Sequence, residues 1–424
     1  MELCHAVLTT SFHGPALDHW SLANGVRCVA AEMPEAPLTC LDLWCRAGSF
    51  TETAGEEGMA HFLEHMVFKG SERLEAGAFD RAIEALGGSS NAATGFDDVH
   101  FHVLIPPDAA ERALELLLDL VLRPALEREA FTTEREVVLE EIAQYADQPD
   151  EQVLQQLLNH ACSDHAYGRP ILGHRHSLLA MEPSTMRQFH QRRYQGPHCC
   201  LAISGPGARQ LRTVVESSLL CDLPSGEASA DPGAALKLQA GVHNMVVPRL
   251  ESARLLMLWG GAKASDQAWV MGADLTTTLL GEGRRSRLVA RLREELQLVE
   301  TVDMDLTVLE QGCLVTLEIS CEEEDLDRVQ ATVQDLLSQG SPFTQEEMER
   351  GRQLVGNGLR YALESTGQVA AMAASQTLWN RPQDLLQPLQ HLQAWTDERL
   401  SADLIPMLQP QQACTLIATP GAVG

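Results

Sequence analysis

Apolar positions in the first half of the chain fall into short runs that turn residues separate. The pair Asn24-Gly25 is typical of a tight turn, and apolar and polar residues alternate around it from Trp20 to Arg46. Alternation with a period of two places one set of side chains on one face of a strand. The pattern predicts strands at residues 26–31, 38–45, 90–94, 99–104 and 201–205.

Between these runs the apolar residues recur at helical spacing, every three or four positions. Gly87-Gly88 is expected to end one helix, because glycine tolerates a positive φ. Thr132-Thr133 can cap another helix, which Asp147-Gln148-Pro149 then stops. The predicted helices cover residues 55–68, 76–86, 109–122, 134–146, 152–161 and 184–194.

Residues 222–233 interrupt this pattern, since they have the composition of a linker and no periodicity. After them residues 256–261 repeat the pattern of 41–46, and helical sequence follows both. The same offset places Thr276-Thr277-Thr278-Leu279-Leu280 at the position of residues 61–65. The second half is further predicted to contain a helix at 288–296, strands at 301–308, 313–320 and 414–418, and a mostly helical stretch from 323 onward.

A chain of 424 residues exceeds what one hydrophobic core usually serves, so at least two domains are expected. The repeat predicts an amino-terminal domain at residues 1–221 and a linker at 222–240. A homologous carboxy-terminal domain is predicted at residues 241–424, and it has no ligand-type residues at the position of 61–65.

Charge and cysteine content narrow the classes of function. The formal net charge of -28 disfavours binding to nucleic acid or to an anionic membrane, although it can equally be a solubilising surface. The 11 cysteines are an odd number without a CxxC pair, which is typical of reduced thiols in a cytosolic protein. The first twenty residues contain no Lys or Arg, and no uncharged apolar stretch is long enough to span a bilayer. We therefore expect a cytoplasmic protein.

The most informative stretch is His61-Phe62-Leu63-Glu64-His65. If it is helical, His61 and His65 project from the same face and can share one metal ion. Neutral imidazole nitrogen suits zinc, and a catalytic zinc keeps one coordination position open for water. The Glu64 carboxylate leans toward the same space and can act on that water. A third protein ligand is required.

The best candidate for the third ligand lies on the predicted helix at residues 134–142, where Glu141 is one of several acids. Glu134 and Glu141 are seven residues apart, so they lie on one stripe of the predicted helix, beside its apolar face. Two acids at the border of a buried face favour a cationic partner, although Glu-rich helices are often simply solvated. Two other histidine pairs compete for metal, but neither has an acid at ligand spacing in the sequence: His100 with His102, and His174 with His176.

His61-x-x-Glu64-His65, followed by Glu134 and Glu141, resembles the inverted zinc-peptidase motif of the pitrilysin and insulysin family, the inverzincins. The resemblance covers nearly the whole chain, and the length is similar to the single-subunit branch that includes mitochondrial processing peptidase and its bacterial relatives. Further stretches that look like this family are Gly58-Met59-Ala60, Gly87-Gly88 with Asn91-Ala92-x-Thr94, Tyr167-Gly168-Arg169-Pro170-Ile171-Leu172-Gly173, and Ser286-Arg287-Leu288.

The resemblance implies an α+β fold of two duplicated domains, each a mixed β-sheet flanked by helices. It also implies a zinc endopeptidase that hydrolyses unfolded peptides in a chamber formed by two subunits, with one Zn2+ per chain. Carried over residue by residue, it makes His61, His65 and Glu141 the metal ligands, Glu64 the catalytic base and Glu134 a supporting acid. By the same likeness, Asn91 and Ala92 fall on the edge strand that pairs with the substrate backbone.

One departure from the family pattern concerns the second half. Relatives that complete the site from that half use an Arg and, seven residues later, a Tyr to hold the substrate carbonyl. Here Arg293 matches the first position but Glu300 occupies the second, and an ionised carboxylate cannot donate that hydrogen bond. The likeness therefore implies a heterodimer with a homologous subunit that carries the Arg/Tyr pair. The alternatives are an active homodimer, and a non-catalytic core-type or scaffolding subunit.

Overall fold

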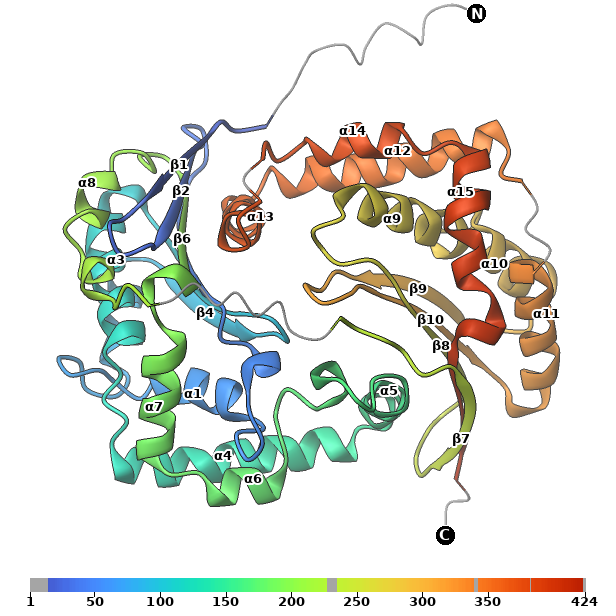
Figure 1. Cartoon of the computed structure of the whole chain (residues 1–424), viewed down its shortest axis with the longest axis horizontal. Coiled ribbons are helices and arrows are strands. Elements are labelled where there is room, and N and C mark those ends of the chain that lie inside the picture. The colour runs from blue at the N-terminus through green and yellow to red at the C-terminus, as the bar shows by residue number, and fades with distance from the viewer. Residues whose placement is uncertain (1–13, 227–234, 339–341, 382, 422–424) are drawn as a thin grey trace, which may run out of the picture.

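Two β-sheets with helices packed on them make up the structure (Figure 1). The computed structural model describes residues 14–226, 235–338, 342–381 and 383–421. The six-stranded first sheet has the order β1-β2-β6-β3-β5-β4, and the five-stranded second sheet has the order β7-β11-β8-β10-β9. The strands are β1 (Leu17–Ser21), β2 (Arg27–Glu32), β3 (Thr39–Cys45), β4 (Ser89–Thr94), β5 (Val99–Ile105), β6 (Cys199–Gly205), β7 (Gly241–Val247), β8 (Ala253–Gly260), β9 (Thr301–Thr307), β10 (Leu314–Cys321) and β11 (Cys414–Pro420).

The two sheets repeat one topology. The series β2-β6-β3-β5-β4 corresponds to β7-β11-β8-β10-β9, and in each series the first pair is parallel and the others are antiparallel. Trp44 of β3 and Trp259 of β8 lie in corresponding strands, as the repeated pattern predicts. The predicted α+β class, with two related halves and mixed sheets, is confirmed.

Helices cover the sheets in both halves (Figure 1). None of the helices in the described ranges combines the length and the apolar character that a bilayer crossing needs. The helices are α1 (Met59–Val67), α2 (Ala78–Ala85), α3 (Ala110–Leu122), α4 (Arg128–Asp147), α5 (Pro149–Ala161), α6 (Arg175–Ala180), α7 (Pro183–Arg193), α8 (Arg212–Val215), α9 (Gln267–Gly281), α10 (Arg287–Val289), α11 (Leu326–Ser338), α12 (Gln345–Ala362), α13 (Thr366–Leu378), α14 (Pro388–Gln393) and α15 (Asp397–Asp403).

Several boundaries differ from those expected. Helix α4 begins at Arg128 rather than at residue 134, because the hydroxyls of Thr132 and Thr133 donate to the carbonyls four residues earlier and so lie within the helix instead of capping it. The helix expected at 288–296 divides into α10 and a π-helical turn. The edge strands β1 and β7 were not predicted, since neither carries the continuous apolar run of a central strand.

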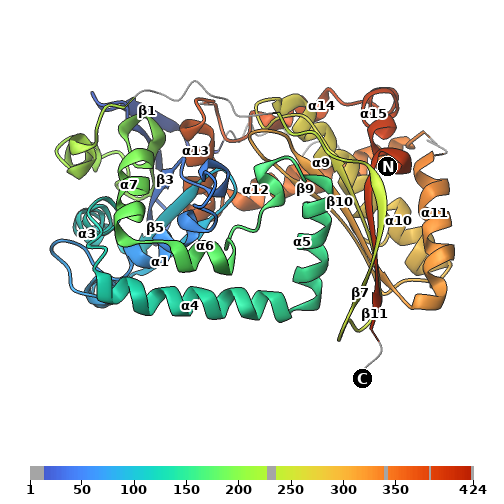
Figure 2. The same ribbon diagram turned by 60° about the horizontal axis from the view of Figure 1, so that its bottom comes forward.

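One helix from each half packs against the sheet of the other half (Figures 1 and 2). Helix α5, from the first half, packs its buried Val153 and Leu157 against Leu256 and Leu416 of the second sheet. Helix α13, from the second half, covers β2, β3 and β6 with a row of small residues that includes Ala370. The core on each sheet therefore contains residues from both halves, and the linker limits of 222–240 stay a prediction. Residues 227–234 of that linker lie outside the described residues.

The turns that close the two edge hairpins meet between the halves. The Asp97 carboxylate, in the β4–β5 turn, accepts hydrogen bonds from the Tyr167 hydroxyl at 2.6 Å and from the backbone N–H of Glu310 at 2.9 Å. Glu310 lies in the β9–β10 turn, and its two carboxylate oxygens are each 2.7 Å from a guanidinium nitrogen of Arg381. Side chains distant in sequence thus fix the halves against each other.

The Arg381–Glu310 pair should contribute to stability far more than a surface pair does. The two side chains are only 17% and 13% exposed, so Arg381→Gln leaves a largely desolvated carboxylate without its partner. We expect a loss of about 3 kcal/mol in the free energy of unfolding, measured with denaturant. The exposed pair Arg112–Glu115 provides the control, since Arg112→Gln should cost less than about 1 kcal/mol. Equal losses in the two variants would contradict this reading of the interface.

Candidate active site

Helix α1 starts where a buried carboxylate holds its first turn. Glu52 accepts hydrogen bonds from the backbone N–H groups of Gly58 at 3.1 Å and Ala60 at 2.9 Å. Burial raises the pKa of Glu52 to about 8, against the opposing effect of these two bonds. Gly58 has a φ of 94°, and a Cβ there would lie 2.5 Å from the carbonyl oxygen of Leu172. The helix therefore begins at Met59, four residues later than the pattern predicted.

The sequence of α1 buries one face and presents the other. His61, Glu64 and His65 remain on the side that is not filled by the core, and the exposed fractions of the two imidazoles are 12% and 23%. The rings of the two histidines are 4.7 Å apart between centroids. The residues of α1 that are packed into the first core are Met59, Ala60, Phe62, Leu63, Met66 and Val67.

Helix α4 packs against α1 and supplies the carboxylates (Figure 2). The rings of Phe62 and Phe131 anchor the contact, with centroids 4.6 Å apart. Glu141 Oε2 lies 3.4 Å from His65 Nε2 and 3.8 Å from His61 Nε2. One ligand atom from each of these three residues lies within 4.8 Å of the other two. The structure thus brings together the three residues that the sequence proposed as ligands.

Glu134, two turns before Glu141 on α4, fixes the orientation of one imidazole. Its Oε1 is 2.9 Å from His65 Nδ1, and its Oε2 forms an ion pair with Lys69 at 2.7 Å. A carboxylate on Nδ1 keeps the proton there and leaves the Nε2 lone pair directed at Glu141. Sequence reasoning placed Glu134 beside the site but did not identify Lys69, which follows α1 by two residues and neutralises this buried acid.

The donor set fits a zinc ion. Two imidazoles and one carboxylate are a combination that catalytic zinc sites use, with a fourth position left for water. Burial, together with the nearby His65, lowers the pKa of His61 to about 4, so this ring is neutral and its lone pair is available. His61 Nδ1 is buried and has no hydrogen-bond partner in the described part of the chain, so His65 is the better oriented of the two.

Glu64 points to the same region and is held from the edge of the first sheet. The Thr94 hydroxyl, at the end of β4, donates a hydrogen bond to Glu64 Oε2. Burial raises the pKa of Glu64, and the carboxylate of Glu141 adds to the rise, whereas Thr94 and His65 oppose it. A carboxyl with a raised pKa and a fixed orientation is a stronger base than an ordinary glutamate, which suits it to taking up a proton.

Strand β4 itself is an open edge. Among the strands of the described residues it pairs only with β5, and its residues alternate between exposed and half-buried side chains. Asn91 is exposed and Ala92 is half-buried, and both precede Thr94 on the strand that contacts Glu64. An edge of this kind offers unpaired backbone groups to an extended peptide.

The predicted residues of the second half are not joined to this cluster. Arg293 lies in the π-helical turn and pairs with Glu294 at 3.0 Å, while 37% of its side chain is exposed. Glu300 accepts a hydrogen bond from the Ser252 hydroxyl at 2.8 Å. No ion pair or hydrogen bond within the described ranges links Arg293 to residues of α1 or α4.

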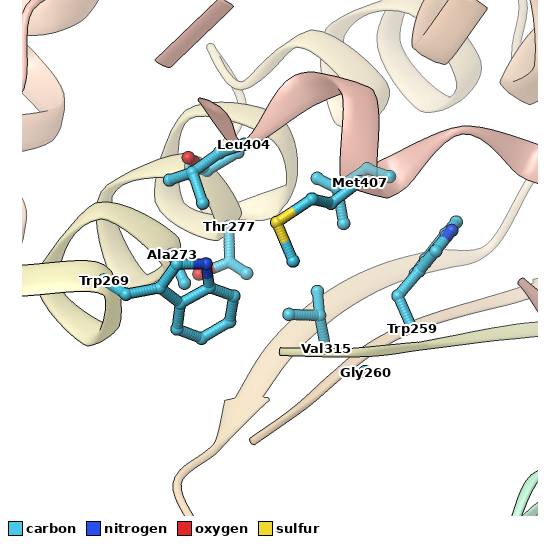
Figure 3. Close-up of a pocket in the computed structure, with 10 residues that line it drawn as sticks. Trp259, Gly260, Trp269, Ala273, Thr277, Val315, Leu404 and Met407 are labelled. Carbon is cyan, nitrogen blue, oxygen red and sulfur yellow. The ribbon is translucent and has the colours of Figure 1, made fainter. Parts of the chain in front are cut away.

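The corresponding position in the second half has different chemistry. Residues 276–280 are buried in α9 and carry no imidazole or carboxylate. Thr277 lines a cavity of about 10 Å³ with Trp259, Trp269 and Met407, and these side chains face one another around it (Figure 3). Such a volume is roughly that of one water molecule, so this apolar cavity offers no room for a substrate.

Sequence reasoning did not identify Asp42, whose side chain lies next to His100 and His102. Asp42, on β3, lies opposite His102 on β5, and its Oδ1 is 3.0 Å from His100 Nδ1. In the sequence, Asp42 is recognisable as an isolated acid inside an otherwise apolar strand. Its proximity to His100 and His102 follows only from the register between β3 and β5. The other pair, His174 and His176, has stacked rings 5.4 Å apart.

Comparison with known proteins gives one family for both halves. Residues 27–175 match the model described as insulinase (peptidase family M16), and residues 181–355 match the one described as the peptidase M16 inactive domain. The two matches together span most of the chain. The second match begins before the predicted linker, whose limits stay a prediction.

Curated relatives and solved structures agree with the match to peptidase family M16. A protein from Rickettsia bellii is 27% identical over 81% of this chain and 83% of its own length, and one from Bacillus subtilis, YmxG, is 24% identical over 96% and 99%. Both are named uncharacterized zinc proteases. A protease from Helicobacter pylori has the same fold, with a TM-score of 0.88 and 22% identity over 96% of this chain and all of its own. A peptidase M16 inactive domain from Pseudomonas fluorescens has a TM-score of 0.87 and 20% identity, over 96% of this chain and 98% of its own.

The contact between Glu134 and His65 predicts a measurable loss of metal affinity. Glu134→Gln removes the carboxylate that orients His65 and should weaken zinc binding by about 10- to 100-fold, measured by competition with a chromophoric chelator. Glu136→Gln is the matched control, because Glu136 is exposed on the same helix. An unchanged affinity in Glu134→Gln would show that this hydrogen bond does not orient the ligand.

Proposed function

The chain belongs to peptidase family M16, the insulinase family, and we propose that it is a zinc-dependent endopeptidase that cleaves unfolded peptides with Glu64 as its catalytic base. The observation that carries this proposal is the convergence of His61, His65 and Glu141 next to Glu64. Zinc, when bound by these three residues, makes water acidic and polarises the carbonyl of the scissile peptide.

Glu64 moves the proton in this proposal. Its carboxylate takes a proton from the attacking water and later gives it to the nitrogen of the leaving amine. The hydrogen bond from Thr94 holds Oε2, so Oε1 is the atom that we assign to proton transfer. The raised pKa of Glu64 favours the first step, because a stronger base takes the proton of the water more readily.

The substrate is proposed to bind as an added strand. An extended peptide that pairs with β4 at Asn91 and Ala92 would run beside Thr94, and therefore past Glu64. Backbone pairing does not depend on side chains, which suits an enzyme that accepts unfolded segments. A folded protein has few unpaired strands to offer, so this geometry favours peptides.

We further propose that the active form is a heterodimer. The partner would be a homologous chain that closes the chamber and carries the Arg and Tyr at the positions of Arg293 and Glu300. Glu300 cannot donate a hydrogen bond to the developing negative charge on the substrate carbonyl, and loss of such a donor costs roughly 3 kcal/mol in transition-state stabilisation. The alternative is an active homodimer, in which either the Tyr is dispensable or another residue such as Arg284 or Arg285 substitutes for it.

A second candidate function is a non-catalytic core-type or scaffolding subunit of the same family. The family name of residues 181–355, an inactive domain, is compatible with that function for the second half. The intact ligand set of the first half favours catalysis, since a scaffold has no need to keep His61, Glu64, His65 and Glu141 together.

Glu64→Gln separates catalysis from metal binding. The amide keeps the shape of the side chain but cannot take a proton, so peptide turnover should fall by about 1000-fold or more, while zinc content stays unchanged. Glu75→Gln, an exposed acid after α1, is the control and should leave both unchanged. Turnover of Glu64→Gln at the wild-type rate would remove Glu64 as the base and would favour the scaffolding function.

The proposed heterodimer predicts that a partner chain increases the peptidase activity of this chain. The isolated chain should turn over slowly, and a homologous chain that lacks the two histidines but carries Arg and Tyr should raise the rate. Glu300→Tyr should raise the rate of the lone chain as well, since the phenol supplies the missing donor. Kinetics on a homodimer of verified mass, with Glu364→Tyr as the control at an exposed site, provides the measurement. A homodimer as fast as any mixture would reject the heterodimer.

A further inference from the structure

A second group of potential metal ligands lies on the opposite face of the first sheet from the core that holds α1. Val99, Phe101 and Val103 of β5 are buried in that core, so the alternate residues His100 and His102 project to the other face. Asp42 on β3 projects to that face too, because it is the direct cross-strand partner of His102. The three side chains come from adjacent strands, which are rigid supports.

The distances within the group suit one ion. One ligand atom from each of Asp42, His100 and His102 lies within 4.8 Å of the other two, as is also true of the His61, His65 and Glu141 group. Asp42 Oδ1 and His100 Nδ1 are 3.0 Å apart, a usual separation for two atoms that bind the same ion at about 2.1 Å. The rings of His100 and His102 are stacked, with centroids 5.6 Å apart.

The surroundings are apolar on one side and open on the other. The Trp44 ring stacks on His100 with centroids 4.5 Å apart, and Trp44 and Leu104 pack against the core under α13. On the other side the cross-strand neighbours from β4 are Asn91 and Ala93, which are small and exposed. Asp42 itself is only 2% exposed, and a buried carboxylate requires a partner of opposite charge or a set of hydrogen bonds.

We propose that Asp42, His100 and His102 form a second binding site for a divalent transition-metal ion such as Zn2+. Two imidazoles and one carboxylate on one side of an ion leave its remaining positions open, and they open toward Asn91 and Ala93 of β4. The ion is held more weakly than at the first site, because no carboxylate of residues 14–226, 235–338, 342–381 or 383–421 orients His102 as Glu134 orients His65. This site does not depend on the proposed peptidase function.

The simpler alternative is that His100 serves only as the hydrogen-bond partner of Asp42. In that case the 3.0 Å contact satisfies the buried acid, and His102 has no part in binding. The two accounts differ in what His102 does. His102 is partly exposed, so it can be replaced with little risk to the fold.

Zinc titration of a full-length background variant tests the site. His61→Ala combined with His65→Ala removes two ligands of the first site, and calorimetric titration of this protein should still give about one equivalent of bound Zn2+. Adding His102→Gln should abolish that binding, or weaken it by at least about 100-fold. The control adds His176→Gln instead, which removes a histidine from the stacked pair without an acid and should leave the titration unchanged.

Three results would overturn the proposal. They are no zinc binding by the background variant, the same zinc affinity with and without His102→Gln in that background, or a loss of affinity with His176→Gln as large as with His102→Gln. A structural measurement covers the case in which a variant fails to fold. Diffraction from wild-type crystals soaked in Zn2+, recorded at the zinc absorption edge, should show an anomalous peak between Asp42, His100 and His102. A fully occupied first site with no such peak would equally reject the second site.

Discussion

The packing of α1 against α4 is the contact on which the candidate chemistry depends. Two histidines four residues apart on α1 supply only two ligands, so the third must come from another element at a fixed distance. The Phe62–Phe131 contact and the Glu134–His65 hydrogen bond set that distance, and together they place Glu141 beside both imidazoles. The edge strand β4 positions the fourth residue of the site, because the Thr94 hydroxyl donates a hydrogen bond to Glu64 and holds it beside the three ligands.

The second half shows how one topology carries a different chemistry. Its sheet repeats the strand order of the first, but the helix that corresponds to α1 buries threonines and leucines where the first half has its ligands. The halves nevertheless depend on each other, since α5 and α13 each complete the core of the opposite sheet and Arg381 joins the two edge turns through Glu310. The second half therefore supports the fold of the first without ligand-type residues at 276–280.

Much of this arrangement could be predicted from the sequence, and the exceptions have physical causes. The period of apolar residues located most strands and helices, and the spacing of His61, Glu64, His65, Glu134 and Glu141 identified the candidate site because local helical geometry governs it. The start of α1 depends on a hydrogen bond from Gly58 to Glu52 and on the contact of Gly58 with Leu172, which is distant in sequence. The local pattern of apolar residues contains neither contact, so it placed the start of the helix too early. Asp42 could not be joined to His100 and His102 without the register between β3 and β5.

The central claim is that two imidazoles and one carboxylate of the first half hold a zinc ion with an open position. X-ray absorption at the zinc edge tests it most directly, on protein that carries His102→Gln, so that zinc at the proposed second site does not contribute. The account predicts two imidazole ligands and additional oxygen ligands at about 2.0 to 2.2 Å, with no sulfur at about 2.3 Å. A zinc–sulfur distance, or protein that retains no zinc at all, would contradict it.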